Sequence, residues 1–181
     1  MPGVAAHPIQ ISTPLPGLTI RDAVEADLPA IVEIYNAAIL TRISTAQLET
    51  VSVAQRLPWF RAHSPEFHPL WIAAIDGQLA GWLSFHSFIA RSAYRGTAEI
   101  SIYVSDKFRR AGVGGTLLAK AVAHSPSLEI TALIGCVFAH NKPSLRLFER
   151  FGFERWGFLP RIASMDGVAR DLTIMGRHIK M

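Results

Sequence analysis

Two parts of the chain carry residues that could do chemistry, the carboxylate of Glu99 and the basic loop 109–114. Glu99 lies in the run 98–104, where apolar and polar residues alternate, so its neighbours on the same strand face are polar or aromatic. A carboxylate on an inner strand is costly unless it is paired or hydrated, and burial would raise its pKa to a value useful for accepting a proton. A structural ion pair with Arg91 or Arg95 is the alternative role for Glu99.

The loop 109–114 reads R-R-A-G-V-G and is followed by apolar residues at helical spacing from Val113 onward. Small residues leave backbone N–H groups uncovered at the start of a helix. Together with the positive helix end and the flanking cations, these groups can bind a phosphate or pyrophosphate. The loop is neither a Walker A motif nor the three-glycine dinucleotide fingerprint. An ordinary glycine-containing helix start with exposed arginines is the alternative.

Composition limits the classes of protein that fit. The 181 residues suit one globular domain, because half of them are hydrophobic and 18% are charged. A net charge of +4 with a single tight basic cluster lacks the basic stripe of a nucleic-acid-binding surface, so we expect a small anionic ligand and no nucleic acid. The longest apolar runs are about eight residues, far short of the ~20 that a membrane span needs, so no membrane association is expected.

The ends of the chain and its single cysteine give further expectations. Residues 1–17 include four prolines and lack a secretory h-region, so they are expected to form a mobile leader before a domain at 18–179, in a cytoplasmic protein. Cys136 is the only cysteine, which excludes an intrachain disulfide and a cysteine-based zinc site, and we expect no metal. Its position within an apolar run predicts a buried small hydrophobe in a strand.

Periodicity and turn residues predict the element order β-α-α-β-β-β-α-β-α-β-β. Asp27, Ser52 and Asn141 are the expected helix N-caps, and Asp-Gly pairs at 76–77 and 166–167 predict tight turns. This order predicts a single α/β (α+β) domain with helices on both faces of a mixed sheet. The expected strands are 18–21, 70–75, 79–86, 98–104, 130–139, 153–158 and 169–175, and the expected helices are 25–40, 52–60, one from 113 and 141–151.

Two motifs resemble those of a known family. The pattern R-x-x-G-x-G after a strand resembles the acyl-CoA pyrophosphate loop of the GNAT acetyltransferase superfamily, and A-R-S-A-Y…E-I-S-I-Y-V-S resembles its branch that acetylates phosphinothricin, methionine sulfoximine and related amino acids. The resemblance implies the GNAT fold, with a mostly antiparallel sheet, over 18–179. It also implies acetyl-CoA as co-substrate, direct attack by the amine of a small acceptor in a ternary complex, and a homodimer.

The resemblance also implies roles for individual residues. Glu99 would be the general base, acting through water, and the backbone N–H of Val104 would polarise the thioester carbonyl. Asn141 is alternatively only an N-cap. The residues expected at the cofactor are Val104, Arg109, Arg110, Ala111, Gly112, Val113, Gly114, Thr116, Asn141 and Ser144.

The acceptor side of the site is less complete. Arg91 and Tyr94 match the A-R-x-A-Y motif of the branch, and the planar fork of an arginine suits an α-carboxylate, although Arg91 could equally be a surface arginine. Tyr103 is expected as a wall of the pocket, and Thr45, with Ser44, as part of a polar loop beside the substrate.

The chain departs from the family pattern at two places. Phe148 stands where a Tyr or His usually protonates the leaving thiolate, so the thiolate leaves unaided, or His140, Tyr103 or a water substitutes. The region around Arg170 lacks the usual aromatic and His, and Asp171 either holds its loop or touches the substrate.

The sequence is also compatible with other functions. The same fold also acetylates peptide N-termini and polyamines. A non-catalytic acyl-CoA sensor would keep the loop 109–114 and explain Phe148, although the presence of Glu99 counts against it. A binding module for anionic partners is disfavoured by the scattered arginines.

Overall fold

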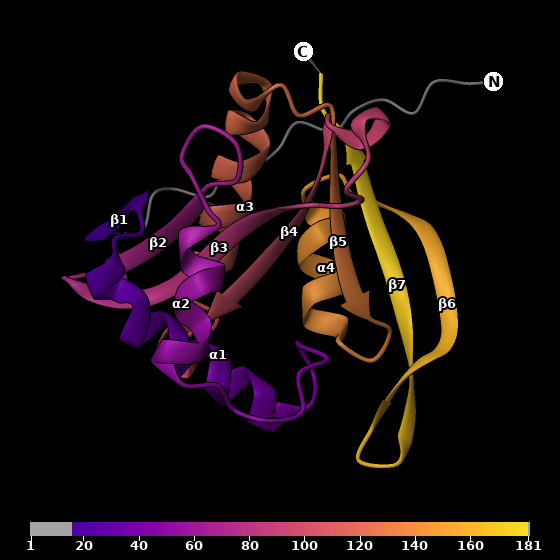
Figure 1. Cartoon of the computed structure of the whole chain (residues 1–181), viewed down its shortest axis with the longest axis horizontal. Coiled ribbons are helices and arrows are strands. Elements are labelled where there is room, and N and C mark those ends of the chain that lie inside the picture. Colours follow the sequence, from indigo (N-terminus) through magenta and orange to yellow (C-terminus); the bar gives the residue numbers. More distant parts are fainter. Residues whose placement is uncertain (1–15, 181) are drawn as a thin grey trace.

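A seven-stranded sheet organises residues 16–180, the part of the chain that the computed structural model describes. The strand order is β1-β2-β3-β4-β5-β7-β6, and every neighbouring pair is antiparallel except β4 and β5 (Figure 1). The predicted mixed, mostly antiparallel sheet is therefore confirmed. The expected leader 1–17 lies outside the described residues apart from its last two.

The strands follow the predicted positions, and the largest differences in length are at the two C-terminal strands. The bounds are β1 (Leu18–Asp22), β2 (Leu70–Ile75), β3 (Gln78–Ser87), β4 (Thr97–Val104), β5 (Ala132–Phe138), β6 (Glu154–Met165) and β7 (Val168–His178). Both β6 and β7 are longer than predicted. The register between them shifts twice, between Arg155 and Gly157 and between Leu159 and Ala163, so β6 does not keep one clean apolar–polar alternation that a sequence pattern could follow.

Two tight turns connect antiparallel strands as predicted. Asp76 and Gly77 have φ values of 48° and 78°, and Asp166 and Gly167 have φ values of 50° and 77°. Positive φ at both central residues is the backbone of the type I′ hairpin turn, which matches the twist of the strands it joins.

Four α-helices cover the sheet, namely α1 (Leu28–Thr41), α2 (Val53–Arg61), α3 (Val113–His124) and α4 (Lys142–Arg150). Two predicted N-caps are confirmed. The hydroxyl of Ser52 accepts from the N–H of Gln55 at 3.1 Å, and the side-chain oxygen of Asn141 accepts from the N–H of Ser144 at 3.2 Å.

Asp27 does not cap α1 in the expected way. Its carboxylate accepts the backbone N–H of Val24 at 2.8 Å and forms an ion pair with Arg21 at 2.7 Å. It therefore stabilises the short 3-10 turn Glu25–Asp27 that precedes α1, and the ion pair holds the pKa of Asp27 below its ordinary value. The carboxylate reaches back along the chain because the turn before α1 presents its own free N–H group.

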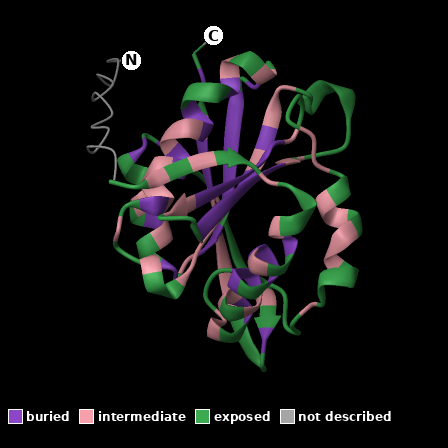
Figure 2. Cartoon of the chain, turned by 90° about the vertical axis from the view of Figure 1, so that its left-hand side faces the viewer, coloured by how far each residue is buried: buried purple, intermediate pink, exposed green. Residues whose placement is uncertain are grey.

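The helices form two layers, each with its own core. Helix α3 packs on strands β2, β3 and β4, and α4 adds Leu145 and Phe148 to the same core. Helix α1 packs on the other face, where Trp82 belongs to the second core. Figure 2 shows the buried strands between these outer layers. Among the described residues, no helix is long and apolar enough to cross a membrane.

The parallel strands β4 and β5 separate after a short stretch of pairing. Their paired residues run only from Thr97 and Ala132 to Glu99 and Ile134, and the two strands then diverge along the rest of their length (Figure 1). Beyond Glu99 and Ile134, the facing edges of β4 and β5 are therefore not hydrogen-bonded to each other. This gap lies within the sheet, between β4 and β5.

Candidate active site

A pocket of about 340 Å³ lies between the sheet and the segment that connects α1 to α2. Side chains from β3, β4 and β5 form one wall, and α1, α2 and their connection form the other. The polar residues that line it are Tyr35, Ser44, Thr45, Arg56, Ser84, His86, Glu99, Ser101, Tyr103 and Cys136. The structure thus brings together four predicted residues, namely Glu99, Tyr103, Thr45 and Ser44.

Glu99 occupies the position where the pocket meets the gap between the parted strands. Burial raises the pKa of Glu99 above its ordinary value, and a hydrogen bond with the thiol of Cys136 partly offsets this rise. None of the ion pairs among residues 16–180 includes Glu99, so the structural pairing with Arg91 or Arg95 is not formed. A half-buried carboxylate without a cationic partner is suited to accept a proton.

Cys136 lies in a strand as predicted, but the expectation that it is buried is wrong. It is exposed and lines the pocket beside Glu99, because the separation of β4 from β5 uncovers this part of β5. The pocket walls nevertheless shield the thiol from part of the bulk water, and this desolvation, together with the neighbouring Glu99, raises the pKa of the thiol to about 12. A thiol with this pKa is not a ready nucleophile, which disfavours a covalent acyl-cysteine route.

Ser84 and His86 are pocket residues that the sequence analysis missed. His86 on β3 stands directly opposite Glu99 on β4, and its Nε2 atom lies 2.8 Å from the hydroxyl of Ser84. Burial, with His63 and Arg56 nearby, lowers the pKa of His86 to about 4, so the ring is neutral at physiological pH. The period-two pattern of 79–86 could have placed both residues on the face of Glu99, once β3 and β4 were paired.

Residues 42–52, which connect α1 to α2, cover one side of the pocket, and we call this segment the roof. The hydroxyls of Tyr35 and Thr45 are 3.0 Å apart, and the hydroxyl of Tyr103 donates to the carbonyl of Ser44 at 3.4 Å. Burial raises the pKa of Tyr103 well above its ordinary value, so this residue is a neutral wall of the pocket. Its interaction with the roof makes it a poor proton donor for a leaving group.

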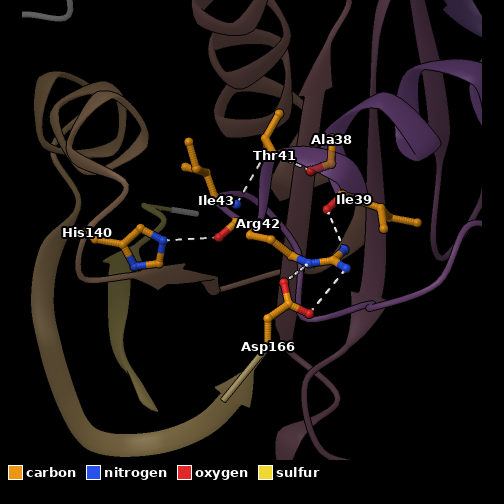
Figure 3. Close-up of polar contacts among 7 residues, drawn as sticks. All are labelled: Ala38, Ile39, Thr41, Arg42, Ile43, His140 and Asp166. Atoms are coloured by element: carbon orange, nitrogen blue, oxygen red, sulfur yellow. Dashed lines mark hydrogen bonds and ion pairs between the residues drawn. The ribbon is translucent and has the colours of Figure 1, made fainter. Parts of the chain in front are cut away.

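The roof is also held by contacts with the turn between β6 and β7 and with the residues before α4 (Figure 3). The guanidinium of Arg42 pairs with Asp166, in the turn between β6 and β7, at 2.7 Å, and also donates to the carbonyl of Ile39 at 2.9 Å. The Nε2 atom of His140 lies 3.2 Å from the carbonyl of Arg42. His140 therefore anchors the roof and is not among the residues that line the pocket, which favours a structural role.

Asp171 also has a structural contact. Its carboxylate accepts the backbone N–H of Arg161 at 2.7 Å, at the position where the register of β6 against β7 shifts. Of the two roles considered for Asp171, the structure thus shows the one that holds the chain in place.

The loop 109–114 has the backbone of an anion site. Arg110 and Gly112 both have positive φ, 65° and 85°, and Gly112 is the N-cap of α3 without a side chain to satisfy the free N–H groups of the first turn. That first turn contains no acidic residue. The side chain of Arg109 pairs with Asp106 at 2.7 Å, and the hydroxyl of Thr116 donates to the carbonyl of Gly112 at 3.2 Å.

The backbone N–H of Val104 points toward the gap. The N–H of the next residue, Ser105, donates to the carbonyl of Ala80 on β3 at 2.9 Å. Because successive amides of a strand point to opposite edges, the Val104 amide points away from β3 and toward the side from which β5 has parted. The structure thus provides a donor at the predicted position.

Asn141 lies at the start of α4 and has two sets of contacts. Besides capping the helix, its side-chain amide donates to the carbonyl of Ile43 at 3.4 Å. Asn141 thus holds the helix start to the roof of the pocket. Contact of Asn141 or Ser144 with a cofactor stays a prediction.

Arg91 and Tyr94 lie outside the pocket lining. Arg91 is the N-cap of the 3-10 turn Ser92–Tyr94 and is exposed, and the ring of Tyr94 packs edge-on at 6.5 Å from Phe88. Their role in acceptor binding therefore stays a prediction, because neither side chain lines the pocket.

Phe148 is a core residue and does not replace an acid in the pocket. It is buried, its ring lies 4.9 Å from that of Phe153, and it fills the space above Gly135 on β5. The departure from the family pattern therefore adds to the hydrophobic core.

A family model described as the acetyltransferase (GNAT) family matches residues 30–153. The chain therefore belongs to the GNAT family of acetyltransferases, which confirms the predicted family and fold.

Its relatives indicate where in the family it lies. A protein of Bacillus subtilis named as a candidate phosphinothricin acetyltransferase is 46% identical over 163 residues, 90% of this chain and 99% of that protein. The L-methionine sulfoximine/L-methionine sulfone acetyltransferase of Pseudomonas aeruginosa is 32% identical over 158 residues, 87% of this chain and 92% of that protein. The structure of a GNAT superfamily phosphinothricin acetyltransferase from Sinorhizobium meliloti in complex with AcCoA matches with a TM-score of 0.85 at 30% identity, covering 90% of this chain and 89% of that chain. The chain is thus an N-acetyltransferase.

Proposed function

We propose that this protein transfers the acetyl group of acetyl-CoA to the amine of a small amino acid or amino-acid analogue of the phosphinothricin or methionine sulfoximine type. The observation that carries the proposal is the position of Glu99, which lies both in the pocket and at the point where β4 and β5 part. An acceptor in the pocket and a donor in the gap would meet at this carboxylate.

The residues around the gap fit acetyl-CoA. The N–H groups of Arg110, Gly112 and the first turn of α3 would bind its pyrophosphate at the positive end of the helix. The N–H groups of Arg109 and Ala111 already donate to the carbonyls of Asp106 and Phe108. When bound, acetyl-CoA supplies an activated acetyl group as a thioester.

Among residues 16–180, no group of His, Cys, Asp and Glu side chains is arranged to hold a metal ion.

The chain's own groups would then assist attack by the amine. Glu99 accepts a proton from the acceptor ammonium, directly or through water, because its raised pKa brings it closer to the working pH than an ordinary carboxylate. The N–H of Val104 donates a hydrogen bond to the oxygen on which negative charge develops. The leaving thiolate departs without a protein acid, since Phe148 is buried in the core and His140 and Tyr103 are engaged with the roof.

The size and chemistry of the pocket support a small acceptor. A volume of about 340 Å³ accommodates an amino acid, and the Pseudomonas aeruginosa and Sinorhizobium meliloti relatives are named as acetyltransferases of methionine sulfoximine and methionine sulfone and of phosphinothricin, respectively. A sensor that only binds acyl-CoA would have no use for an unpaired Glu99 in a polar pocket. Acetylation of peptide N-termini or polyamines would require a more open groove.

The test is release of free thiol from acetyl-CoA in the presence of L-methionine sulfoximine, L-methionine sulfone, phosphinothricin, ordinary amino acids, polyamines and short peptides. We expect turnover with the first group and little with the polyamines and peptides. Binding of acetyl-CoA in calorimetry without turnover of any acceptor would overturn the enzymatic proposal and favour the sensor. Cytoplasmic location and a homodimer stay predictions, and size-exclusion chromatography with light scattering tests the second.

A further inference from the structure

Arg56 is the one pocket residue that carries a fixed positive charge. It lies on α2, and its guanidinium carbon is 3.8 Å from the ring centre of Trp59 and 4.6 Å from that of Tyr35. Both rings hold the guanidinium plane in place by cation–π contact, and Arg56 lines the same pocket as Glu99. The side chain is therefore fixed at the pocket wall.

The guanidinium has no carboxylate partner among residues 16–180. Its Nε atom is buried without any hydrogen-bond partner, and the ion pairs of the described chain do not include Arg56. Four arginines, Arg21, Arg42, Arg61 and Arg109, each pair with a carboxylate, whereas Arg56 meets only aromatic rings at the wall of the pocket.

Such an arrangement is unfavourable in the absence of a ligand. The half-buried guanidinium has lost part of its water without gaining a carboxylate, and an arginine cannot avoid this cost by losing its proton. Burial lowers the pKa of Arg56, which reflects the loss of water around it. Cation–π contact with Trp59 and Tyr35 uses no N–H donor of the guanidinium, so its paired donors suit a planar anion such as a carboxylate.

The charges of the pocket match those of a zwitterion. Arg56 and Glu99 are its charged lining residues at neutral pH, since His86 is kept neutral by its low pKa. An amino acid presents one ammonium and one carboxylate, so both of its charges find an opposite charge in this pocket. An amine without a carboxylate would leave Arg56 unpaired and would add a cation beside it.

We propose that Arg56 binds the carboxylate of the amino-acid acceptor while Glu99 receives its amine, and that Arg56 thereby excludes amines that lack a carboxylate. This inference rests on the proposed function, since it assigns the acceptor end of the same site. It gives to Arg56 the role that the sequence motif suggested for Arg91, which lies outside the pocket lining.

The experiment compares L-methionine sulfone with its primary amide, which keeps the amine and side chain and lacks the carboxylate. Both are assayed at saturating acetyl-CoA with the wild type, Arg56→Met, Arg56→Lys and Arg91→Ala. Methionine retains an apolar chain for packing on Trp59 and Tyr35. Arg61→Met is the matched control, because Arg61 lies on the same helix, is exposed and pairs with Glu25.

We expect Arg56→Met to raise the KM for L-methionine sulfone by about 10- to 100-fold, the usual loss for a charge-assisted hydrogen-bonded pair, with a much smaller change for the amide. Arg56→Lys should fall between the wild type and Arg56→Met, because it keeps the charge but loses the fork. Arg61→Met should retain the wild-type preference for the acid. A merely structural role of Arg56 would change the KM of both acceptors alike.

Equal effects on acid and amide, or no effect, would overturn the role of Arg56. An acid-specific loss in Arg91→Ala alone would assign the carboxylate to Arg91 instead. Calorimetry of L-methionine sulfone binding in the presence of CoA separates this inference from the proposed function. If the wild type binds the acid but does not acetylate it, the proposed acetyltransferase activity is wrong for this acceptor. The role of Arg56 is then tested by comparing the binding affinities of acid and amide in the wild type and the Arg56 variants. If the wild type does not bind the acid, the proposal for Arg56 is wrong.

Discussion

Glu99 and Ile134 are the last paired residues of the parallel strands β4 and β5. The strands part immediately after this pair, so the carboxylate of Glu99 lies at the corner where an interstrand gap begins. One residue further along β4, the side chain would point to the opposite face, toward α3. The position of Glu99 in the register thus fixes both its access to the gap and the face on which an acceptor must bind.

Glu99→Gln should lower kcat by about 10²- to 10⁴-fold, the range usual for loss of a positioned general base. Affinity for acetyl-CoA should stay unchanged, because the loop 109–114 and the start of α3 are untouched. Steady-state kinetics and calorimetry measure the two quantities. Glu33→Gln, at an exposed position on α1, is the matched control and should behave as the wild type.

The pH dependence of the wild-type reaction provides a second readout of Glu99. A base must be deprotonated to act, and burial raises the pKa of Glu99, so activity should fall as pH drops and should begin to fall above the ordinary titration range of a glutamate. A kcat/KM profile with an acidic limb at the ordinary glutamate pKa, or the same limb in Glu99→Gln, would contradict the role of Glu99.

His86 should make the protein less stable in mild acid. Its pKa is lowered from 6.5 to about 4 by burial beside His63 and Arg56, so between these values the unfolded chain binds the proton and the folded one does not. The contribution of neutral His86 to the free energy of unfolding is therefore complete above pH 6.5 and is lost as the pH falls toward 4. Thermal melts across this range should show a shallower dependence on pH in His86→Gln than in the wild type, and parallel curves would argue against this assignment.

Asp166→Asn should affect the acceptor more than it affects folding. The ion pair between Asp166 and Arg42 is at the surface, where such pairs add little stability, but it holds the connection that carries Ser44 and Thr45 over the pocket. We expect a raised KM for the acceptor with an unchanged Tm and unchanged acetyl-CoA affinity. A variant with wild-type KM would show that the roof is held without this pair.

Gly135→Ala should destabilise the protein by about 1–3 kcal/mol, the usual range for overpacking a core. A Cβ atom at Gly135 would lie 2.6 Å from the ring of Phe148, which cannot withdraw because it is packed against Phe153. Phe148→Leu alone should leave a cavity, while the double variant should recover part of the loss, since the two changes share one space. Chemical denaturation of the wild type, the two single variants and the double variant measures this coupling. If the losses in the free energy of unfolding add up, residues 135 and 148 are not energetically coupled.

The sequence predicted the backbone of the site well, because local rules determine it. Alternation in 98–104 placed Ala98 and Ile100 in one core and Glu99 on the pocket face, and Asn141 and Ser52 were recognisable as caps. These features depend on residues near one another in the chain.

Features that depend on distant parts of the chain could not be predicted. Cys136 is exposed only because β4 leaves β5, and a run of apolar residues does not reveal where two strands separate. Arg56 was missed because the direction of its side chain depends on how α2 sits over Trp59 and Tyr35. The contact of Arg42 with Asp166 joins two turns far apart in sequence, and no local pattern indicates such a pair.

The parting of β4 from β5 also affects the ligand-free protein. A sheet interrupted in this way has an additional pair of open edges in its interior, and open strand edges are templates for pairing with other chains. Their amides are also unprotected by interstrand hydrogen bonds, so they should exchange with solvent deuterium faster than amides elsewhere in the same strands. A molecule seated between the strands would close both edges. The co-substrate would thus protect the chain against misassembly as well as taking part in its reaction.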